Sequence, residues 1–232
     1  MGASSKASPR PTDRGPLVGT VGLVAAVLAA AGVCLARSPA PGAATAPGAA
    51  PSPRFVNAAA QAGLTLVNVS GEIQKTTINE TVGNGVCLDD VDGDGRIDVF
   101  LPNGSRARPF PPGAEPRSAL YRNRGDGTFE DVTEKAGVAS RGYWAQGCVF
   151  ADYDDDGRVD LFLTGFGRYI LYRNLGDGKF RDVTAAAGLK GRGWSTGAAF
   201  GDYDGDGRID LYVSHYIDYD SASPPLPPPG SL

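Results

Sequence analysis

The sequence has little of what most catalytic sites need. It contains one histidine and three cysteines, and it shows no GxSxG, HExxH or P-loop motif and no paired set of cysteine and histidine ligands. His215 stands at the end of a predicted strand, in VSHYIDYD, a setting typical of a structural histidine. We therefore predict that the chain is not an enzyme. The competing interpretation is a catalytic or non-catalytic part of a secreted hydrolase that acts on polysaccharide or phosphoester.

Positive charge is not in excess either. The chain has 22 Lys and Arg against 26 Asp and Glu, a formal net charge of −4, which gives no support for nucleic-acid binding. Its hydrophobic content of 41% is that of a folded domain and not of an acidic disordered tail. Few long helical patterns occur beside 33 glycines and 18 prolines, and this composition favours an all-β protein with many turns.

The N-terminus contains the one long apolar run. Residues 1–15 form a basic region, expected to be cytoplasmic, and within residues 16–37 the segment Leu17–Ala36 runs 20 residues without a charge. That length is enough to span a bilayer and exceeds the usual apolar region of a cleaved signal peptide. The basic flank predicts an orientation with the N-terminus inside.

A signal anchor and a cleaved signal peptide both remain open for this segment. Lipoprotein processing at Cys34 is disfavoured because Val33 precedes it, where such sites need a small residue. Each alternative exports the remainder, so we expect an extracytoplasmic domain that is either anchored to the membrane by the N-terminal helix or secreted. Residues 38–54 follow as a Pro/Ala-rich linker.

Residues 55–217 are repetitive, and a Pro-rich tail follows at 218–232. The segment LYRNRGDGTFEDVTEKAGV at 120–138 returns as LYRNLGDGKFRDVTAAAGL at 171–189, and aspartate-rich loops begin at 90, 152 and 202. An insertion at 102–119 is predicted to be a long surface loop. FVNAAAQAGL at 55–64 is a degenerate copy of FEDVTEKAGV at 129–138, so the repeating unit is about 50 residues long.

Each unit contains four short strand candidates. In the second unit they are Gly147–Tyr153, Val159–Thr164, Tyr169–Asn174 and Lys179–Val183. Gly176-Asp177-Gly178 predicts a tight hairpin turn, and 184–188 a short helical turn. Four antiparallel strands in a repeat of this length are typical of a β-propeller blade, whereas a plain β-sandwich gives no reason for a fixed period.

Two of the cysteines lie in equivalent strands of the repeats. Cys87 aligns with Val149, and Cys148 aligns with Val86, so the two are one position out of phase. Side chains alternate between the faces of a strand, and the two cysteines are therefore expected to point to opposite faces. The sequence predicts two buried free thiols and no disulfide.

The three aspartate-rich loops read DVDGDGRID, DYDDDGRVD and DYDGDGRID, and all follow D-x-D-x-D-G-x-x-D. Calcium takes six to eight oxygens, which such a loop can supply from the carboxylates at positions 1, 3, 5 and 9 and the backbone carbonyl of position 7. Glycine at position 6 permits the sharp turn. The predicted Ca2+ ligands, in three sites, are Asp90, Asp92, Asp94, Arg96 and Asp98; Asp152, Asp154, Asp156, Arg158 and Asp160; and Asp202, Asp204, Asp206, Arg208 and Asp210.

Electrostatics favour a bound cation at these loops. Four carboxylates within a few ångströms repel one another by roughly 1 kcal/mol per pair even in a water-like dielectric, so the cluster needs a cation or raised pKa values. The loops are not EF-hands, because position 12 is Leu101, Leu163 or Val213 instead of glutamate and apolar strand sequence follows. The predicted ligand set thus ends at position 9, within a β-hairpin.

The paired segments GCVFADYDDDGRVDLFLTG and LYRNLGDGKFRDVTAAAGL resemble the FG-GAP/VCBS repeat, in the form found in proteins related to ASPIC/UnbV and cartilage acidic protein. The resemblance covers roughly residues 55–217. It implies the propeller fold of the integrin alpha-chain head, with calcium in the three hairpin loops. It also implies an extracytoplasmic setting and adhesive or ligand-binding roles, with a protein or glycan as the unknown ligand.

The blade count departs from that family. About three and a half blades are expected here, whereas propellers generally have four to eight. Either the chain is a truncated product or fragment, or closure needs further blades from another chain, since an open sheet edge invites strand pairing. The predicted fold class is thus all-β, an incomplete propeller preceded by a transmembrane or signal helix.

Overall fold

The computed structural model describes residues 54–75, 78–191 and 193–217. Contacts divide the chain between Arg54 and Phe55, and all the strands lie in the unit that begins at Phe55. The predicted basic region, the apolar run at 17–36, most of the linker and the Pro-rich tail lie outside the described residues. None of the helices in the described part is long and apolar enough to cross a membrane.

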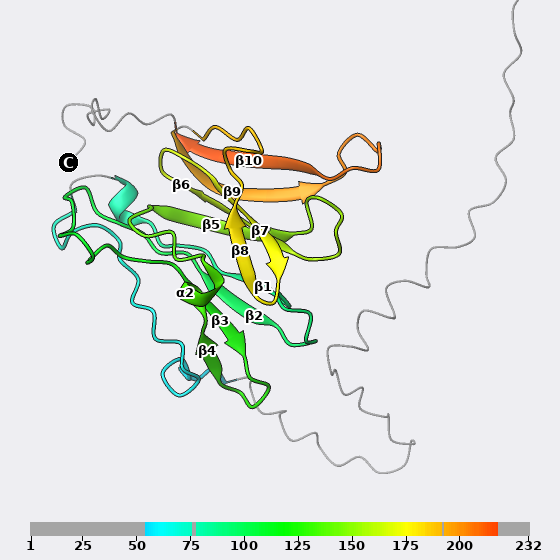
Figure 1. The fold of residues 1–232 in the computed structure, drawn as a ribbon. Coiled ribbons are helices and arrows are strands. Elements are labelled where there is room, and N and C mark those ends of the chain that lie inside the picture. Colours follow the sequence, from blue (N-terminus) through cyan, green and yellow to red (C-terminus); the bar gives the residue numbers. More distant parts are fainter. Residues whose placement is uncertain (1–53, 76–77, 192, 218–232) are drawn as a thin grey trace, which may run out of the picture. The chain divides into compact units, whose positions relative to one another are not determined.

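The described residues form three antiparallel sheets that follow one another along the chain (Figure 1). The first sheet holds four strands in sequence order, the second sheet holds four more, and the third sheet is a pair. Their bounds are β1 Cys87–Asp89, β2 Asp98–Leu101, β3 Ala119–Asn123 and β4 Phe129–Asp131; β5 Ala145–Ala151, β6 Asp160–Gly165, β7 Ile170–Gly176 and β8 Lys179–Asp182; and β9 Trp194–Gly201 and β10 Asp210–Ile217.

This arrangement confirms an all-β chain built from sheets of four antiparallel strands. All four strands of the second sheet lie within two residues of the predicted bounds. The hairpin loop after β7 is Asp177-Gly178, and both residues have positive φ (52° and 66°), as a type I′ turn requires. Closure into a propeller stays a prediction.

Short helical turns close the repeats at equivalent places. The helix α2 (Thr133–Ala136) ends at Gly137, which has a left-handed φ of 78°. Gly63 and Gly188 occupy the same place in their units, with φ of 81° and 69°. The turn at Gly63 receives a hydrogen bond from the Phe129 N–H to the Ala62 carbonyl of 2.8 Å, so the degenerate copy at 55–64 packs on the outer strand β4.

The largest core cluster lies between the first and second sheets. Phe100 and Leu120 contribute from the first sheet, and Leu161, Leu163 and Ile170 from the second, all of them buried. The other face of the second sheet meets the third sheet, where the Phe162 and Phe200 rings meet edge to face at 6.0 Å. The two four-stranded sheets are therefore stacked by face, and apolar residues at alternate strand positions supply the contact.

The innermost strands approach closely where the sheets meet. β5 contacts β1 on one side and β9 on the other. Gly147 in β5 explains how the backbones come so near: a side-chain carbon at this position would lie 2.5 Å from the Thr196 carbonyl oxygen and 2.8 Å from the Thr164 hydroxyl. Only glycine fits such an approach.

The prediction of two free thiols was wrong, because Cys87 and Cys148 form a disulfide with their Cα atoms 5.8 Å apart. The two cysteines do lie on opposite faces of their strands, but the prediction assumed that such residues cannot meet. Here the strands belong to two stacked sheets, and the face of β1 that looks toward the second sheet meets the opposite face of β5. Residues one position out of phase are thus the ones that meet across the interface.

The insertion at 102–119 is a surface loop only in its later part. Residues 102–105 are buried, and the Asn103 side chain ties the insertion to the N-terminal segment. Its Oδ1 accepts the Val69 N–H at 2.8 Å, and its Nδ2 donates to the Val67 carbonyl at 3.1 Å. Further along, the Arg106 guanidinium lies 3.9 Å from the Phe110 ring centroid.

Candidate metal centres

The aspartate loops connect the first two strands of each sheet. Loop 1 (residues 90–98) follows β1, loop 2 (152–160) follows β5, and loop 3 (202–210) follows β9. Each one ends where the second strand of its sheet begins, at Asp98, Asp160 or Asp210. The strands hold the ends of each loop in register, because these aspartates pair with Asp89, Ala151 and Gly201 across the hairpin.

The first aspartate of each loop shapes the backbone of that loop. The Asp152 carboxylate accepts the N–H groups of Asp156 at 3.0 Å and Gly157 at 2.7 Å. Asp90 and Asp202 do the same for the residues four and five positions further on. In each loop the backbone therefore turns around the carboxylate of the first aspartate, and the three copies share this conformation.

Two positions in each loop have left-handed backbone. The glycine at position 6 has a φ of 82° in all three copies, at Gly95, Gly157 and Gly207. Position 4 is also left-handed, and in loop 2 it is Asp155, with a φ of 57°. Aspartate is among the few side chains that tolerate this conformation, so loop 2 keeps the shape of the other two.

The loop fold brings carboxylates together. In each loop three aspartates offer oxygens that all lie within 4.8 Å of one another. These groups are Asp90, Asp92 and Asp94 in loop 1; Asp152, Asp154 and Asp160 in loop 2; and Asp202, Asp204 and Asp206 in loop 3. Acidic clusters of this kind can hold a metal ion, and oxygen-only ligand sets suit the hard cations calcium and magnesium.

The aspartate at position 9 is buried in the first two loops and structural in all three. Asp160 accepts the Asn174 N–H at 2.7 Å and the Tyr153 N–H at 3.2 Å. Asp98 accepts the equivalent N–H groups of Asn123 and Val91, and Asp210 that of Tyr203. Burial raises the pKa of Asp98 and raises that of Asp160 to about 6, in spite of these hydrogen bonds.

The arginine at position 7 was predicted as a carbonyl ligand, and this role stays a prediction. Its side chain in the first two loops bridges two parts of the sheet. The Arg158 guanidinium pairs with Asp156 of its own loop, and its Nε donates to the Asn174 carbonyl at 3.2 Å. Arg96 repeats both contacts in loop 1, with Asp94 and the Asn123 carbonyl.

An asparagine in the third strand was missed by sequence reasoning. The Asn174 side chain is buried, and its Nδ2 donates to the Val159 carbonyl in loop 2 at 3.0 Å and to the Val91 carbonyl in loop 1 at 2.9 Å. Asn123, its equivalent in the first sheet, donates to the Ile97 carbonyl at 3.0 Å. Recurrence of the LYRN motif at 120–123 and 171–174 was the signal that could have identified both residues.

Loop 1 contains a carboxylate oxygen that lacks a partner in the described part of the chain and that a cation could bind. Asp92 Oδ1 is shielded from solvent and has no hydrogen-bond partner among the described residues. Burial, and after it the charge of Asp94, raise the pKa of the Asp92 carboxyl. A buried carboxylate oxygen without a donor is costly, and a divalent cation removes that cost. The residues present therefore fit a hard metal ion.

Loop 2 differs because an arginine enters it. The Arg173 guanidinium of β7 pairs with both Asp154 and Asp156. Although burial alone acts to raise the pKa of Asp156, the hydrogen bonds from Arg173 and the Arg158 N–H and the charges of both arginines hold it below its usual value. Asp156 is not in the grouped set of loop 2.

The single histidine takes part in packing between the second and third sheets. His215 in β10 lies with its Nε2 3.1 Å from the Tyr169 hydroxyl, and the two rings meet edge to face. This contact agrees with the structural role predicted for the residue. The prediction that the chain has no enzyme activity stays a prediction.

Comparison with known proteins decides the family. The model of the FG-GAP-like repeat matches residues 90–163 and 152–213, which together make up more than half of the chain. The chain belongs to the FG-GAP-like repeat family. Each match begins at the first aspartate of a loop, so the loops and the strands after them are the part that the family shares.

The FG-GAP-like chain is also homologous to cartilage acidic protein 1. It is 30% identical to the protein of Homo sapiens over 109 residues and 28% identical to that of Xenopus tropicalis over 124 residues. These segments cover 45% and 52% of this chain but 15% and 17% of the relatives. The chain thus matches a small part of the length of its curated relatives.

Proposed function

We propose that this FG-GAP-like chain binds calcium in its three aspartate loops and serves as a recognition or adhesion module outside the cytoplasm. The observation that carries the proposal is the repeated geometry: three loops of one conformation, each with three carboxylates in reach of a single ion. Surface aspartates that only cap turns have no reason to recur in this arrangement. The buried Asp92 oxygen without a donor supports a cation in loop 1.

Calcium would stabilise the hairpins that hold the sheets. In each loop the metal would be held by three neighbouring carboxylates, and it would cancel their mutual repulsion. An ion that binds only the folded chain adds about 2.7 kcal/mol per site at a hundredfold excess over its dissociation constant. Because Asp90, Asp152 and Asp202 already fold the loop backbones, the carboxylates are in place to bind an ion, and the strands need not move.

The disulfide between Cys87 and Cys148 supports an extracytoplasmic location, because such bonds persist in oxidising compartments. The apolar run at 17–36 is part of the same proposal, as a membrane anchor or an export signal. The ligand is proposed to be a protein or a glycan, in keeping with a repeat module that presents loops on a stable scaffold.

Further blades are the proposed partner of the third sheet. Phe100 in the first sheet and Phe162 in the second occupy one repeat position, and each is buried against the sheet that follows. Tyr212 occupies the same position in the third sheet and is exposed. We include in the proposal that another four-stranded sheet, from this chain's continuation or from another chain, covers this face.

Calcium dependence is tested by thermal unfolding of the full chain in chelator and in millimolar calcium. We expect calcium to raise the melting temperature by several degrees, since 1 kcal/mol shifts it by roughly 2–4 °C in a domain of this size. The variant Asp92→Asn/Asp154→Asn/Asp204→Asn should lose most of the shift. Asp177→Asn, an aspartate in a hairpin turn outside the loops, is the matched control and should keep it. Equal melting temperatures with and without calcium would sink the metal proposal.

A further inference from the structure

Two equivalent arginines stand beside the aspartate loops but are engaged differently. Arg122 in β3 and Arg173 in β7 are the third residue of the LYRN motif in their repeats. In loop 2, Arg173 Nε lies 2.7 Å from Asp154 Oδ2, and its Nη2 donates to Asp156 Oδ2 at 3.0 Å. The guanidinium therefore neutralises the carboxylates at positions 3 and 5 of that loop.

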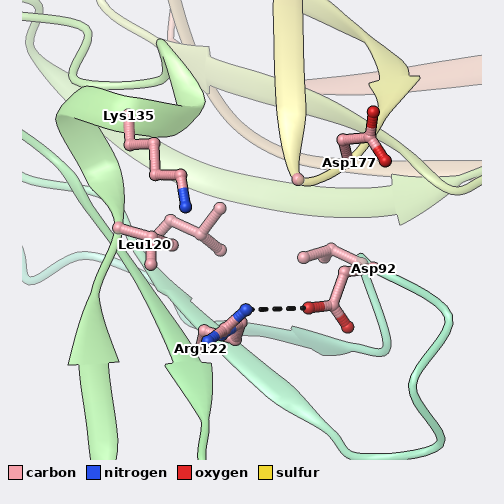
Figure 2. Close-up of a pocket in the computed structure, with 8 residues that line it drawn as sticks. Asp92, Leu120, Arg122, Lys135 and Asp177 are labelled. Atoms are coloured by element: carbon pink, nitrogen blue, oxygen red, sulfur yellow. Dashed lines mark ion pairs between the residues drawn. The ribbon is translucent and has the colours of Figure 1, made fainter.

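In loop 1 the corresponding contact is loose. Arg122 Nη1 lies 3.8 Å from Asp92 Oδ2, and its Nη2 lies 3.5 Å from Glu130 Oε2. Figure 2 shows Arg122 beside Asp92 on the wall of a cavity of about 310 Å³ between the first sheet and the β7–β8 hairpin. Arg122 is thus shared between the loop and the outer strand, whereas Arg173 is committed to the loop.

The residue on the outer strand explains the difference. The strand register places Arg122 opposite Glu130 and Arg173 opposite Arg181. Opposite charges at directly paired positions attract and like charges repel. Glu130 therefore draws Arg122 away from loop 1, and Arg181 drives Arg173 toward loop 2. The rest of the motif is nearly the same in both repeats, LYRNRGDGTFEDVT and LYRNLGDGKFRDVT.

We propose that Arg173 is a built-in competitor for the cation of loop 2, and that the residue opposite it on the outer strand sets the strength of this competition. The inference rests on the proposed calcium function and adds its regulation. Loop 1, whose arginine is held by Glu130, fills at low calcium. Loop 2 fills only when calcium is high enough to displace Arg173, so the two loops respond to different concentrations.

The expected size of the effect follows from Coulomb's law. A unit positive charge about 5 Å from a divalent ion lowers the affinity for the ion roughly tenfold in a water-like dielectric. Movement of the arginine side chain away from the ion reduces this loss. Salt weakens the effect, because the loops are near the surface. Because Arg122 also lies near loop 1, part of this effect is common to both loops, and a difference of about two- to severalfold between them is expected at moderate ionic strength.

Calorimetric titration of the full chain with calcium alone can isolate each loop. Loop 2 is measured in an Asp92→Asn/Asp204→Asn background, and loop 1 in an Asp154→Asn/Asp204→Asn background. Asparagine keeps an oxygen acceptor at each site while it removes a charge. The added variants are Arg173→Gln and Arg181→Glu for loop 2, and Glu130→Arg for loop 1.

We expect Arg173→Gln and Arg181→Glu each to tighten calcium binding at loop 2, severalfold to about tenfold, and Glu130→Arg to weaken it at loop 1. Arg141→Gln, a change at a surface arginine paired with Glu134, is the matched control and should change neither loop. If Arg173→Gln weakens binding or leaves it unchanged, Arg173 is no competitor and the inference is wrong. If the wild-type chain binds no calcium at all, the proposed calcium function itself is wrong, and this result is distinct from a failure of the arginine variants to change the affinity.

Unfolding in chelator gives a second readout. Without calcium, Arg173→Gln removes the only guanidinium beside Asp154 among the described residues, and the melting temperature should fall. In saturating calcium the same variant should melt at or above the wild-type temperature. A merely structural arginine would lower both values, which contradicts the inference.

Discussion

The second and third sheets carry nearly the same loop and strand sequence but differ in their surroundings. Phe162 in the second sheet is fully buried, with its ring 6.0 Å from that of Phe200, whereas Tyr212 at the same position of the third sheet is 74% exposed. The last aspartate of each loop follows the same trend, since Asp160 is buried and Asp210 is exposed. Burial at a given repeat position therefore depends on the sheet that follows, and not on the local sequence.

The largest expected effect compares the two aromatic positions. Phe162→Ala should lower the free energy of unfolding by about 3–5 kcal/mol, because it leaves a cavity between two sheets. Tyr212→Ala should change it by no more than about 0.5 kcal/mol, as for other exposed sites. Urea denaturation of both variants checks this. A large loss of unfolding free energy for Tyr212→Ala would contradict the contrast between the two sheets, since it would mean that the third sheet is covered in solution.

The disulfide tests how firmly the first two sheets are held together. Replacing both Cys87 and Cys148 by serine should lower the free energy of unfolding by about 2–4 kcal/mol, because the bond closes a long loop across a separation of 61 residues. Urea denaturation with and without reducing agent measures this loss. The double variant, which lacks the disulfide, is the control for the reducing agent. If the reducing agent lowers its stability as well, the loss in the wild-type chain does not come from this disulfide.

The two equivalent asparagines test the link between neighbouring loops. Asn174→Ala leaves the carbonyls of Val91 and Val159 without their donor and should cost about 1–3 kcal/mol. Asn123→Ala removes bonds to the Ile97 carbonyl and the Gly125 N–H of its own sheet. The bond to Gly125 has its equivalent at Gly176, which Asn174→Ala also removes, so Asn123→Ala should cost less because it breaks no contact with a neighbouring loop. Denaturant titration ranks the two, and a larger loss for Asn123→Ala would show that the contact between loops contributes little.

The smallest expected effect comes from copying the disulfide to the next interface. Val149 occupies the repeat position of Cys87, and Ala198 that of Cys148. The variant Val149→Cys/Ala198→Cys should form a bond between the second and third sheets and raise the free energy of unfolding by about 1–2 kcal/mol, less than the native bond because engineered bonds carry strain. Mass spectrometry after thiol labelling detects the bond. Labelling of the thiols introduced at positions 149 and 198 in the folded chain would show that the interfaces are not equivalent.

Much of the repeat could be predicted from the sequence. The period, the four strands of the second unit and the tight turn at Gly176-Asp177-Gly178 depend on local alternation and turn chemistry, which neighbouring residues in the chain determine. The loops were predictable for the same reason, because the aspartate at position 1 and the glycine at position 6 act within nine residues.

Contacts between sheets were not predictable in this way. The disulfide was missed because the prediction did not consider that opposite faces of equivalent strands meet where two sheets stack. Asn174 was missed because its second acceptor, Val91, lies 83 residues away along the chain. The different engagement of Arg122 and Arg173 depends on Glu130 and Arg181 across a strand pair, and the register that places them opposite each other comes from the folded sheet.

The sequence by itself thus determined the repeated unit: its strands, its turns, its aspartate loops and its family. These features are short-range, since each follows from residues within one hairpin. Only the tertiary structure decided which faces are buried, which cysteines meet and how Arg122 and Arg173 are engaged. The physical reason is that stacked sheets present opposite faces to each other. The same repeat position is therefore packed, disulfide-bonded or exposed to water according to which residues of the next sheet lie against it.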